Sequence, residues 1–343
     1  MINNLNFLKN NLFINFITLL FIIVIFLNHI HNSIDPYKQV DLGNNNQTFV
    51  LIDKSEIKKE LSLKLVSNDS YANILNRECK ITGDFHDRHK VRWVKALFLK
   101  NIFDFSYDLN QQLPYYSNII LHSLLIFFSL IILNKTFVLD RKYNLIFLLY
   151  VTFIFQQHLS EYSYSIFEAF FLSLALYASK NKKHLIFFLA CLFAILNRES
   201  GFVIIFSWLI FNNKEFKELI LFFIFSTLVF VAMNFDILKC LIEPKFFIPL
   251  ENQEGQVNFS ELVDNNLIST IKLIFVNFLL PFGLGVFYLI QTTNKNKILI
   301  ALFSVYLIMF IFATPAHHIS VRMIILPLIF TSIYFYTKEI KVK

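Results

Sequence analysis

Residues 185–211 read LIFFLACLFAILNRESGFVIIFSWLIF, and this stretch decides how we expect the chain to fold. Two apolar runs, Leu185–Leu196 and Gly201–Phe211, are separated only by Asn197-Arg198-Glu199-Ser200. Four polar residues between such runs predict a tight turn at a membrane surface. An adjacent Arg and Glu at this turn are not ordinary lipid-facing sequence, because ionisable groups at membrane depth are costly and face a cavity or a partner.

The composition extends this interpretation to the whole chain. Hydrophobic residues make up 56% of the 343 residues, and long apolar runs recur from Asn11 to Tyr336. This pattern indicates a multi-pass membrane protein rather than one large soluble core. The excess of Phe, Ile, Asn and Lys indicates an AT-rich genome, so a single Phe or Asn has little weight. The net charge of +7 does not indicate a nucleic-acid partner, because most lysines outside one loop stand at the ends of apolar runs.

The apolar runs predict an all-α, polytopic membrane helix bundle of about ten spans. The first run, Asn11–Leu27, has no small-residue cleavage site after it, which predicts an uncleaved span. We expect the first span in residues 1–30, a long outer loop at 31–113, and about nine spans in 114–343 with a second outer loop at 236–268. The centres of these nine are Asn118–Leu133, Leu145–Gln156, Ser165–Tyr177, Leu185–Leu196, Gly201–Phe211, Leu219–Met233, Ile271–Ile290, Ile298–Ala313 and Val321–Phe335.

The charges of the short loops orient the bundle. Alternate connections and the C-terminal tail carry the basic residues Lys135, Arg141, Lys142, Lys180, Lys182, Lys183, Lys214, Lys217, Lys295, Lys297, Lys338, Lys341 and Lys343. Because positive loops stay in the cytoplasm, both termini are expected to be cytoplasmic, in a bacterial inner membrane. The reversed topology places every one of these clusters outside.

Two segments of the long outer loop predict amphipathic helices. Lys54–Leu65 has helical spacing of its apolar residues, and Asp87–Phe103 has a clearer stripe. The stripe consists of Val91, Val94, Leu97, Phe98 and Ile102. Basic residues take the other positions, which suits a helix lying at the bilayer surface. The alternative is a helix packed on a small core of the loop itself.

The predicted topology gathers unusual ionisable residues on the outer side. They are His29, His31, Asp35, Asp84, His86, Asp87, Arg88, His89, His158, Glu161, Arg198, Glu199, His317, His318 and Arg322. The inner connections hold one imidazole, His184. For any single residue, a solvated loop end is the alternative. The one-sided set predicts an outward-facing functional site.

Two of these residues suggest specific chemistry. Asp35 emerges directly from the first span, and Pro36 fixes the exit direction. A carboxylate there takes a proton from an acceptor hydroxyl, or holds a divalent cation near a diphosphate. The pair Asp84 and Asp87 offers a second acidic group. Arg322 suits bidentate binding of a phosphate or carboxylate, with an ion pair to Glu199 as the alternative.

Glu168 falls two turns into a predicted span, on the face of Glu161. A buried carboxylate needs a cation or a raised pKa. It therefore either bonds to another helix or lines the floor of a polar cavity. The pair His317-His318 suits a metal or a phosphate. The three cysteines lack the spacing of a structural zinc site, and no resident metal is expected from them.

The chain resembles the GT-C superfamily of integral-membrane glycosyltransferases in its architecture and in three short elements. These are the acidic Asp35 soon after the first span, the turn Asn197–Phe202, and Arg322-Met323-Ile324-Ile325-Leu326-Pro327. The paired acidic motif of that family is absent at Asp35, whose neighbours are Ile34 and Pro36.

The resemblance implies transfer of a sugar from a polyprenyl-phosphate donor to a glycan, lipid or protein acceptor on the outer face, in cell-envelope synthesis. Arg198 and Arg322 would then steady the lipid phosphate, and Asp35 and Glu199 would be the catalytic candidates. A divalent cation is the one cofactor that this chemistry suggests. Further substrate-binding candidates are His158, Glu161, Asp84, Asp87, His317 and His318.

Three other functions stay open. A transporter or flippase for an anionic lipid or sugar uses the same cations without chemistry. An envelope acyltransferase or polysaccharide polymerase also has outer His and Arg residues. A structural subunit of a surface-polymer machine needs none of them. The transferase hypothesis requires Asp35 and Arg198 to open into one outer cavity.

Overall fold

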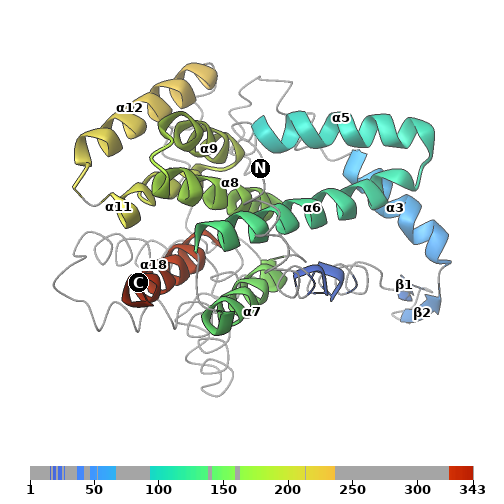
Figure 1. Cartoon of the computed structure of the whole chain (residues 1–343). Coiled ribbons are helices and arrows are strands. Elements are labelled where there is room, and N and C mark those ends of the chain that lie inside the picture. Colours follow the sequence, from blue (N-terminus) through green and yellow to red (C-terminus); the bar gives the residue numbers. More distant parts are fainter. Residues whose placement is uncertain are drawn as a thin grey trace, which may run out of the picture. The chain divides into compact units, whose positions relative to one another are not determined.

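The structure is a computed structural model, and the part of the chain that it describes is mostly helical (Figure 1). It describes residues 16, 18–20, 22–24, 27, 37–41, 47–51, 53–66, 93–137, 141–158, 163–212, 214–235 and 324–342. The chain divides into two compact units, residues 1–127 and 128–343, with the border inside helix α6 (Leu113–Thr136).

The first unit holds one departure from the expected all-α fold. Strands β1 (Tyr37–Asp41) and β2 (Gln47–Leu51) pair antiparallel, with Tyr37 opposite Leu51 and Val40 opposite Thr48. The physical reason is local, because the strands contain β-branched residues and flank the turn-forming sequence Gly43-Asn44-Asn45-Asn46.

Helix α3 (Lys54–Val66) confirms that the Lys54–Leu65 segment is helical, but of the apolar residues predicted to share one face, Ile57, Leu61 and Leu65, only Ile57 is buried. Asp53 precedes it and caps it, since the Ser55 backbone N–H donates to Asp53 Oδ1 at 3.1 Å. The Ser55 hydroxyl donates to the other carboxylate oxygen at 2.9 Å. These two bonds, the backbone one first, lower the pKa of Asp53.

Helix α5 (Trp93–Leu109) begins and ends later than the expected Asp87–Phe103. It packs on α3 and buries Leu99 and Phe103, whereas Ile102 of the predicted stripe is 36% exposed and Phe105 is 68% exposed. The predicted stripe was therefore wrong at Ile102. The buried face of α5 agrees instead with the alternative prediction, a helix that packs on a small core of the loop itself, because α3 belongs to the same predicted loop.

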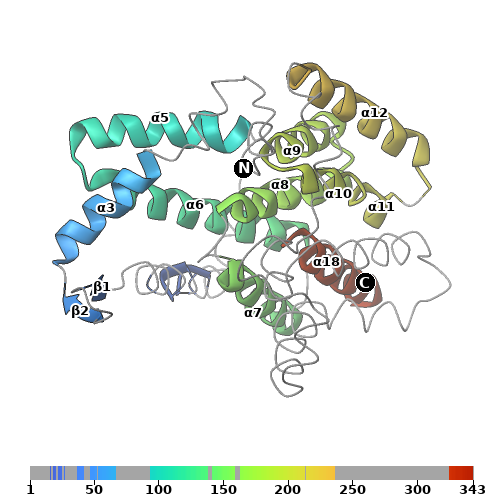
Figure 2. The same cartoon turned by 180° about the vertical axis from the view of Figure 1, so that it is seen from behind.

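Most predicted spans within the described part of the second unit correspond to helices. These are α7 (Arg141–His158), α8 (Ser163–Lys180), α9 (His184–Asn197), α12 (Phe216–Met233) and α18 (Ile325–Val342), in addition to α6. Helix α8 packs against α7, α9 and α18 (Figure 2). The predicted spans Ile271–Ile290 and Ile298–Ala313 lie outside the described residues, as do most of the first span and the loop at 236–268.

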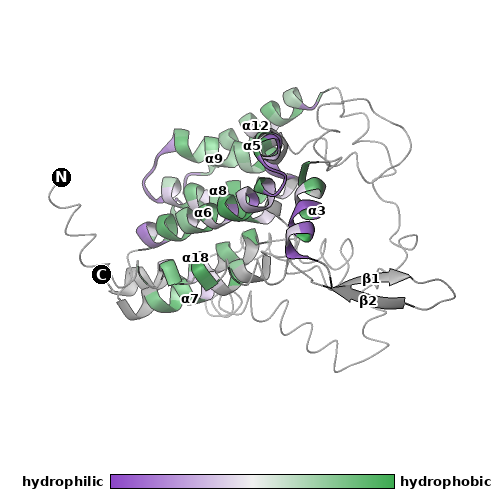
Figure 3. Cartoon of the chain, turned by 90° about the vertical axis from the view of Figure 1, so that its right-hand side faces the viewer, coloured by the Kyte–Doolittle hydropathy of each residue, from purple (hydrophilic) through white to green (hydrophobic). Residues whose placement is uncertain are grey.

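Two of the described helices, α6 and α12, are long and apolar enough to cross a membrane. Helix α12 also exposes a row of large apolar side chains, including Phe223, Phe225 and Leu228. Figure 3 shows hydrophobic residues along most of this helix. An exposed apolar face of this kind is unfavourable in water and favourable in lipid, which supports association with a membrane.

The predicted span Gly201–Phe211 is not one continuous helix. It consists of the 3-10 turn η2 (Glu199–Gly201) and the short helices α10 (Phe202–Ile205) and α11 (Trp208–Phe211). Between the two helices the backbone hydrogen bonds join residues three apart, as in a 3-10 turn. For example, the Ser207 N–H donates to the Ile204 carbonyl at 2.9 Å. Phe202–Phe211 is therefore an apolar helical segment with a break at Phe206 and Ser207, because apolar composition does not fix helix continuity; that it crosses the membrane as one span stays a prediction.

The lysine-bearing segment ends come together at one end of the second unit. The Lys180 ammonium group donates to the Thr136 carbonyl, which joins the C-terminal ends of α8 and α6. Lys182 and Glu215 lie 2.6 Å apart and join the α8–α9 turn to the start of α12. The rings of Phe211 and Tyr336 have centroids 4.8 Å apart. We call this region, with Lys135, Lys180, Lys182 and Lys183, the lysine end.

Candidate functional site

The turn between α9 and η2 is as tight as the sequence predicts. Helix α9 ends at Asn197, and Arg198 follows in an extended conformation with φ −165° and ψ 148°. The Arg198 backbone N–H still donates to the Ala194 carbonyl at 2.9 Å. The Gly201 N–H donates to the Arg198 carbonyl at 2.8 Å, so the chain reverses direction within four residues.

Gly201 is required by the close approach of η2 to α9. A Cβ atom at this position would lie 2.5 Å from the Ile195 backbone nitrogen and would overlap the Ala194 carbonyl. Both obstacles are backbone atoms of a helix, which cannot rotate away. Any side chain at residue 201 would push the turn off the end of α9.

The turn contacts one carboxylate, Glu168 of α8. The Glu168 side chain is fully buried, and the Ser200 hydroxyl donates to its Oε1. Nη1 of Arg198 lies 3.8 Å from its Oε2, and the Arg198 side chain is 14% exposed. We call these three residues the Glu168–Arg198–Ser200 cluster. Of the alternatives expected for a buried Glu168, the structure shows a nearby cation, Arg198, and a hydrogen bond to another segment through Ser200.

The members of the cluster differ in whether they can contact a bound molecule. Glu168 is inaccessible, so it does not act on a bound molecule directly. Part of the Arg198 side chain is accessible. A guanidinium recognises phosphate or carboxylate oxygens, and here its Nη1 already lies 3.8 Å from one carboxylate oxygen, Glu168 Oε2. The arrangement therefore suits binding of an anionic group.

Other predicted site residues are placed by the structure only in part. Glu199 lies in η2 and His158 ends α7, but their side chains are not described. The remaining predicted positions lie outside the described residues: Asp35, Asp84, Asp87, Glu161, His317, His318 and Arg322. Sequence reasoning singled out Arg198 and Glu168 separately. It did not include Ser200, which carries no signal beyond its place in the turn.

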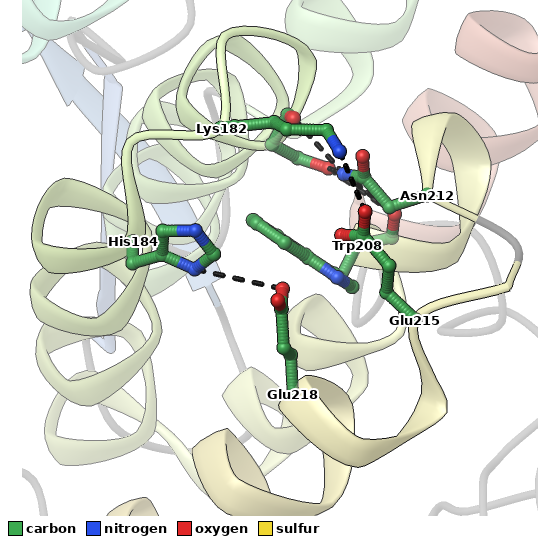
Figure 4. Close-up of polar contacts among 7 residues, drawn as sticks. Lys182, His184, Trp208, Asn212, Glu215 and Glu218 are labelled. Carbon is green, nitrogen blue, oxygen red and sulfur yellow. Dashed lines mark hydrogen bonds and ion pairs between the residues drawn. The ribbon is translucent and has the colours of Figure 1, made fainter.

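The lysine end has its own polar network, drawn in Figure 4. The Asn212 amide donates to the Ser179 carbonyl at 3.0 Å and to the Ser179 hydroxyl oxygen at 3.1 Å. The Ser179 hydroxyl donates to the Trp208 carbonyl at 3.2 Å. These bonds fasten the end of α8 to the end of α11, a structural role.

One ion pair and one contact between an imidazole and a carboxylate flank this network. Lys182 donates to Glu215 at 2.6 Å, and His184 Nδ1 lies 3.6 Å from Glu218. The hydrogen bond between Lys182 and Glu215 raises the pKa of the lysine and lowers the pKa of the glutamate. Lys182 has φ 52°, a left-handed conformation that favours glycine, and it lies in the turn between the end of α8 at Lys180 and the start of α9 at His184.

Within the described residues, no group of three or more His, Cys, Asp or Glu side chains is placed to hold a metal ion. The residues suggested for a divalent cation, Asp35 above all, lie outside that part of the chain. Comparisons with protein-family models, curated proteins and solved structures find no match to this chain. The site is therefore interpreted from its own residues.

Proposed function

We propose that this chain is a multi-pass membrane glycosyltransferase that binds the phosphate of a polyprenyl-phosphate sugar at Arg198. The observation that carries the proposal is the buried pair of Arg198 and Glu168 at a helix break. Burial of two opposite charges stabilises a fold little, because desolvation offsets their attraction. Retaining such a pair inside a membrane bundle is more typical of a ligand site.

The lengths of the helices support a location of this pair below the membrane surface. Helix α9 has 14 residues, which span about 20 Å. Glu168 lies a similar distance, about 18 Å, along α8 from Lys180. If the lysine end lies at one surface of a hydrocarbon layer about 30 Å thick, the Arg198 turn lies inside the layer. A lipid phosphate would reach it from the opposite surface.

In the proposed reaction the other predicted residues have the roles implied by the GT-C resemblance. Arg322 would share the lipid phosphate with Arg198, and Asp35 would accept the proton of the acceptor hydroxyl. Glu199 is the second catalytic candidate. The acceptor is a glycan, lipid or protein on the outer face, in the synthesis of a bacterial cell envelope.

A second candidate function is a transporter or flippase for an anionic lipid. The observation that favours it is the interrupted segment η2–α10–α11, since transporters build midplane sites from broken helices. Both functions use Arg198 to hold an anionic group. They differ in whether the sugar–phosphate bond is cleaved.

The test uses membranes that contain the full chain, supplied with lipid-linked sugars and candidate acceptors. We expect sugar release and transfer for the wild type, and loss of at least tenfold for Asp35→Asn and for Arg198→Ala. Lys217→Ala, an exposed residue at the lysine end, is the matched control and retains activity. Full retention in both site variants would refute the site. Translocation of the lipid without sugar release would favour the flippase.

A further inference from the structure

A separate positive cluster lies at the lysine end, where α6 and α8 terminate. The ammonium groups of Lys135 and Lys183 lie 5.5 Å and 5.2 Å from the centroid of the Tyr177 ring. They are therefore at most about 11 Å from each other. Lys180 adds a third cation, which donates to the Thr136 carbonyl beside them. We call Lys135, Lys180, Lys183 and Tyr177 the tyrosine–lysine cluster.

Two carboxylates lie nearby and face other residues at this end. Glu215 pairs with Lys182, and Glu218 Oε2 lies 3.6 Å from His184 Nδ1. The N-terminus of α9 adds positive potential through its backbone N–H groups. The side chain of the N-cap residue, Lys183, makes no hydrogen bond to these groups. The ammonium groups around the Tyr177 ring repel each other, and a bound anion would reduce this repulsion. The cluster therefore fits a ligand that carries a negative group.

An exposed apolar surface continues from this cluster along the helices. On α6 the exposed residues Phe128, Ile131 and Lys135 follow each other at helical spacing on one face. On α9 the residue Leu185, close to Lys183, is 70% exposed. Helix α6 is one of the two that are long and apolar enough to cross a membrane. A negative headgroup at the lysines would thus have its acyl chains against Phe128 and Ile131.

We infer that the tyrosine–lysine cluster binds the headgroup of an anionic phospholipid. The phosphate contacts the ammonium groups of Lys135 and Lys183, which lie around the Tyr177 ring, and the acyl chains lie along the exposed face of α6. Binding of this kind holds the ends of α6 and α8 together. The site is independent of the proposed transfer reaction, because it lies at the opposite end of α9 from Arg198.

The test is lipid binding by the full chain purified in a mild detergent. Titration with phosphatidylglycerol, followed by native mass spectrometry and by the melting temperature, is compared with phosphatidylcholine of the same acyl chains. We expect binding and a rise in melting temperature with phosphatidylglycerol only. The double variant Lys135→Gln/Lys183→Gln is expected to bind at least tenfold more weakly. If it is not recovered folded, Lys135→Gln alone is expected to lose about fivefold.

The matched control is Lys214→Gln/Lys217→Gln, which removes the same charge from exposed positions at the same end. It should change phosphatidylglycerol binding less than twofold. An equal loss in this control would show a diffuse charge effect and overturn the site, as would unchanged binding in the Lys135/Lys183 variant. Equal stabilisation by inorganic phosphate alone would assign the cluster to a soluble anion and overturn the lipid.

Discussion

Replacement of Glu168 by glutamine tests whether the buried cluster holds the α9–η2 turn in place. The substitution keeps the shape and leaves an oxygen that accepts from Ser200, but it removes the charge that faces Arg198. At the 3.8 Å separation and an effective dielectric constant of about 20, the Coulomb attraction is about 4 kcal/mol. Desolvation of the carboxylate offsets part of it. We expect Glu168→Gln to lower the free energy of unfolding by about 2–3 kcal/mol.

The assay is reversible unfolding in mixed micelles with increasing denaturing detergent. Arg198→Met, which leaves the carboxylate without its cation, should cost about 3 kcal/mol. Because each single variant leaves one buried charge behind, the double variant should cost less than the sum by about 1–2 kcal/mol. That coupling is the specific signature of a direct interaction.

The matched control for this experiment is Asp104→Asn. Asp104 lies 2.8 Å from Lys100, a shorter separation, but its side chain is 39% exposed. Solvent screens an exposed pair, so this variant should change the free energy of unfolding by less than about 1 kcal/mol. A loss below about 0.5 kcal/mol for Glu168→Gln, or additivity with Arg198→Met, would refute the role of the cluster.

Three further changes have expected outcomes. Gly201→Ala should destabilise the protein by about 1–3 kcal/mol or abolish its folding, because the added methyl group meets the backbone of α9; a normal unfolding midpoint would contradict this contact. Ser200→Ala should cost about 1.5–3 kcal/mol through the lost bond to a charged group, whereas Ser173→Ala, a buried hydroxyl that bonds only within α8, should cost about 1 kcal/mol or less. Glu215 has a lowered pKa, so its contribution is present above its unfolded pKa and is lost as the pH falls below about 5. Glu215→Gln should flatten that acid-side decline in a series of melting curves, and an unchanged decline would show that the pair with Lys182 does not contribute.

Sequence patterns located helices well where composition and capping agree. Lys54–Leu65 is a helix because Asp53 supplies its cap and Ile57 its buried face. Three of the lysine-bearing segments predicted to share one side, those after α6, α8 and α11, lie together at the lysine end, whereas Lys295 and Lys297 lie outside the described residues. These positions can be predicted because the charged residues at the ends of apolar runs are visible in the sequence itself. Antiparallel packing of successive helices then brings alternate ends to the same side.

Features that depend on tertiary contacts were not predictable. Gly201–Phe211 has the composition of a span, but it forms two short helices, of which α10 packs on α9 and α8 and α11 packs on α8. The buried face of α5 is set by α3, which no periodicity within α5 reveals. The partner of Arg198 is Glu168, 30 positions earlier in the chain. The spacing of charged residues cannot select that pair among many.

The most direct test of the anion site at Arg198 is binding of a polyprenyl phosphate to the purified full chain. Binding does not depend on whether the reaction is transfer or translocation. We predict that the wild type binds the lipid phosphate, that Arg198→Ala binds at least tenfold more weakly, and that Glu168→Gln falls between them. Equal binding by the wild type and Arg198→Ala would contradict the proposed site.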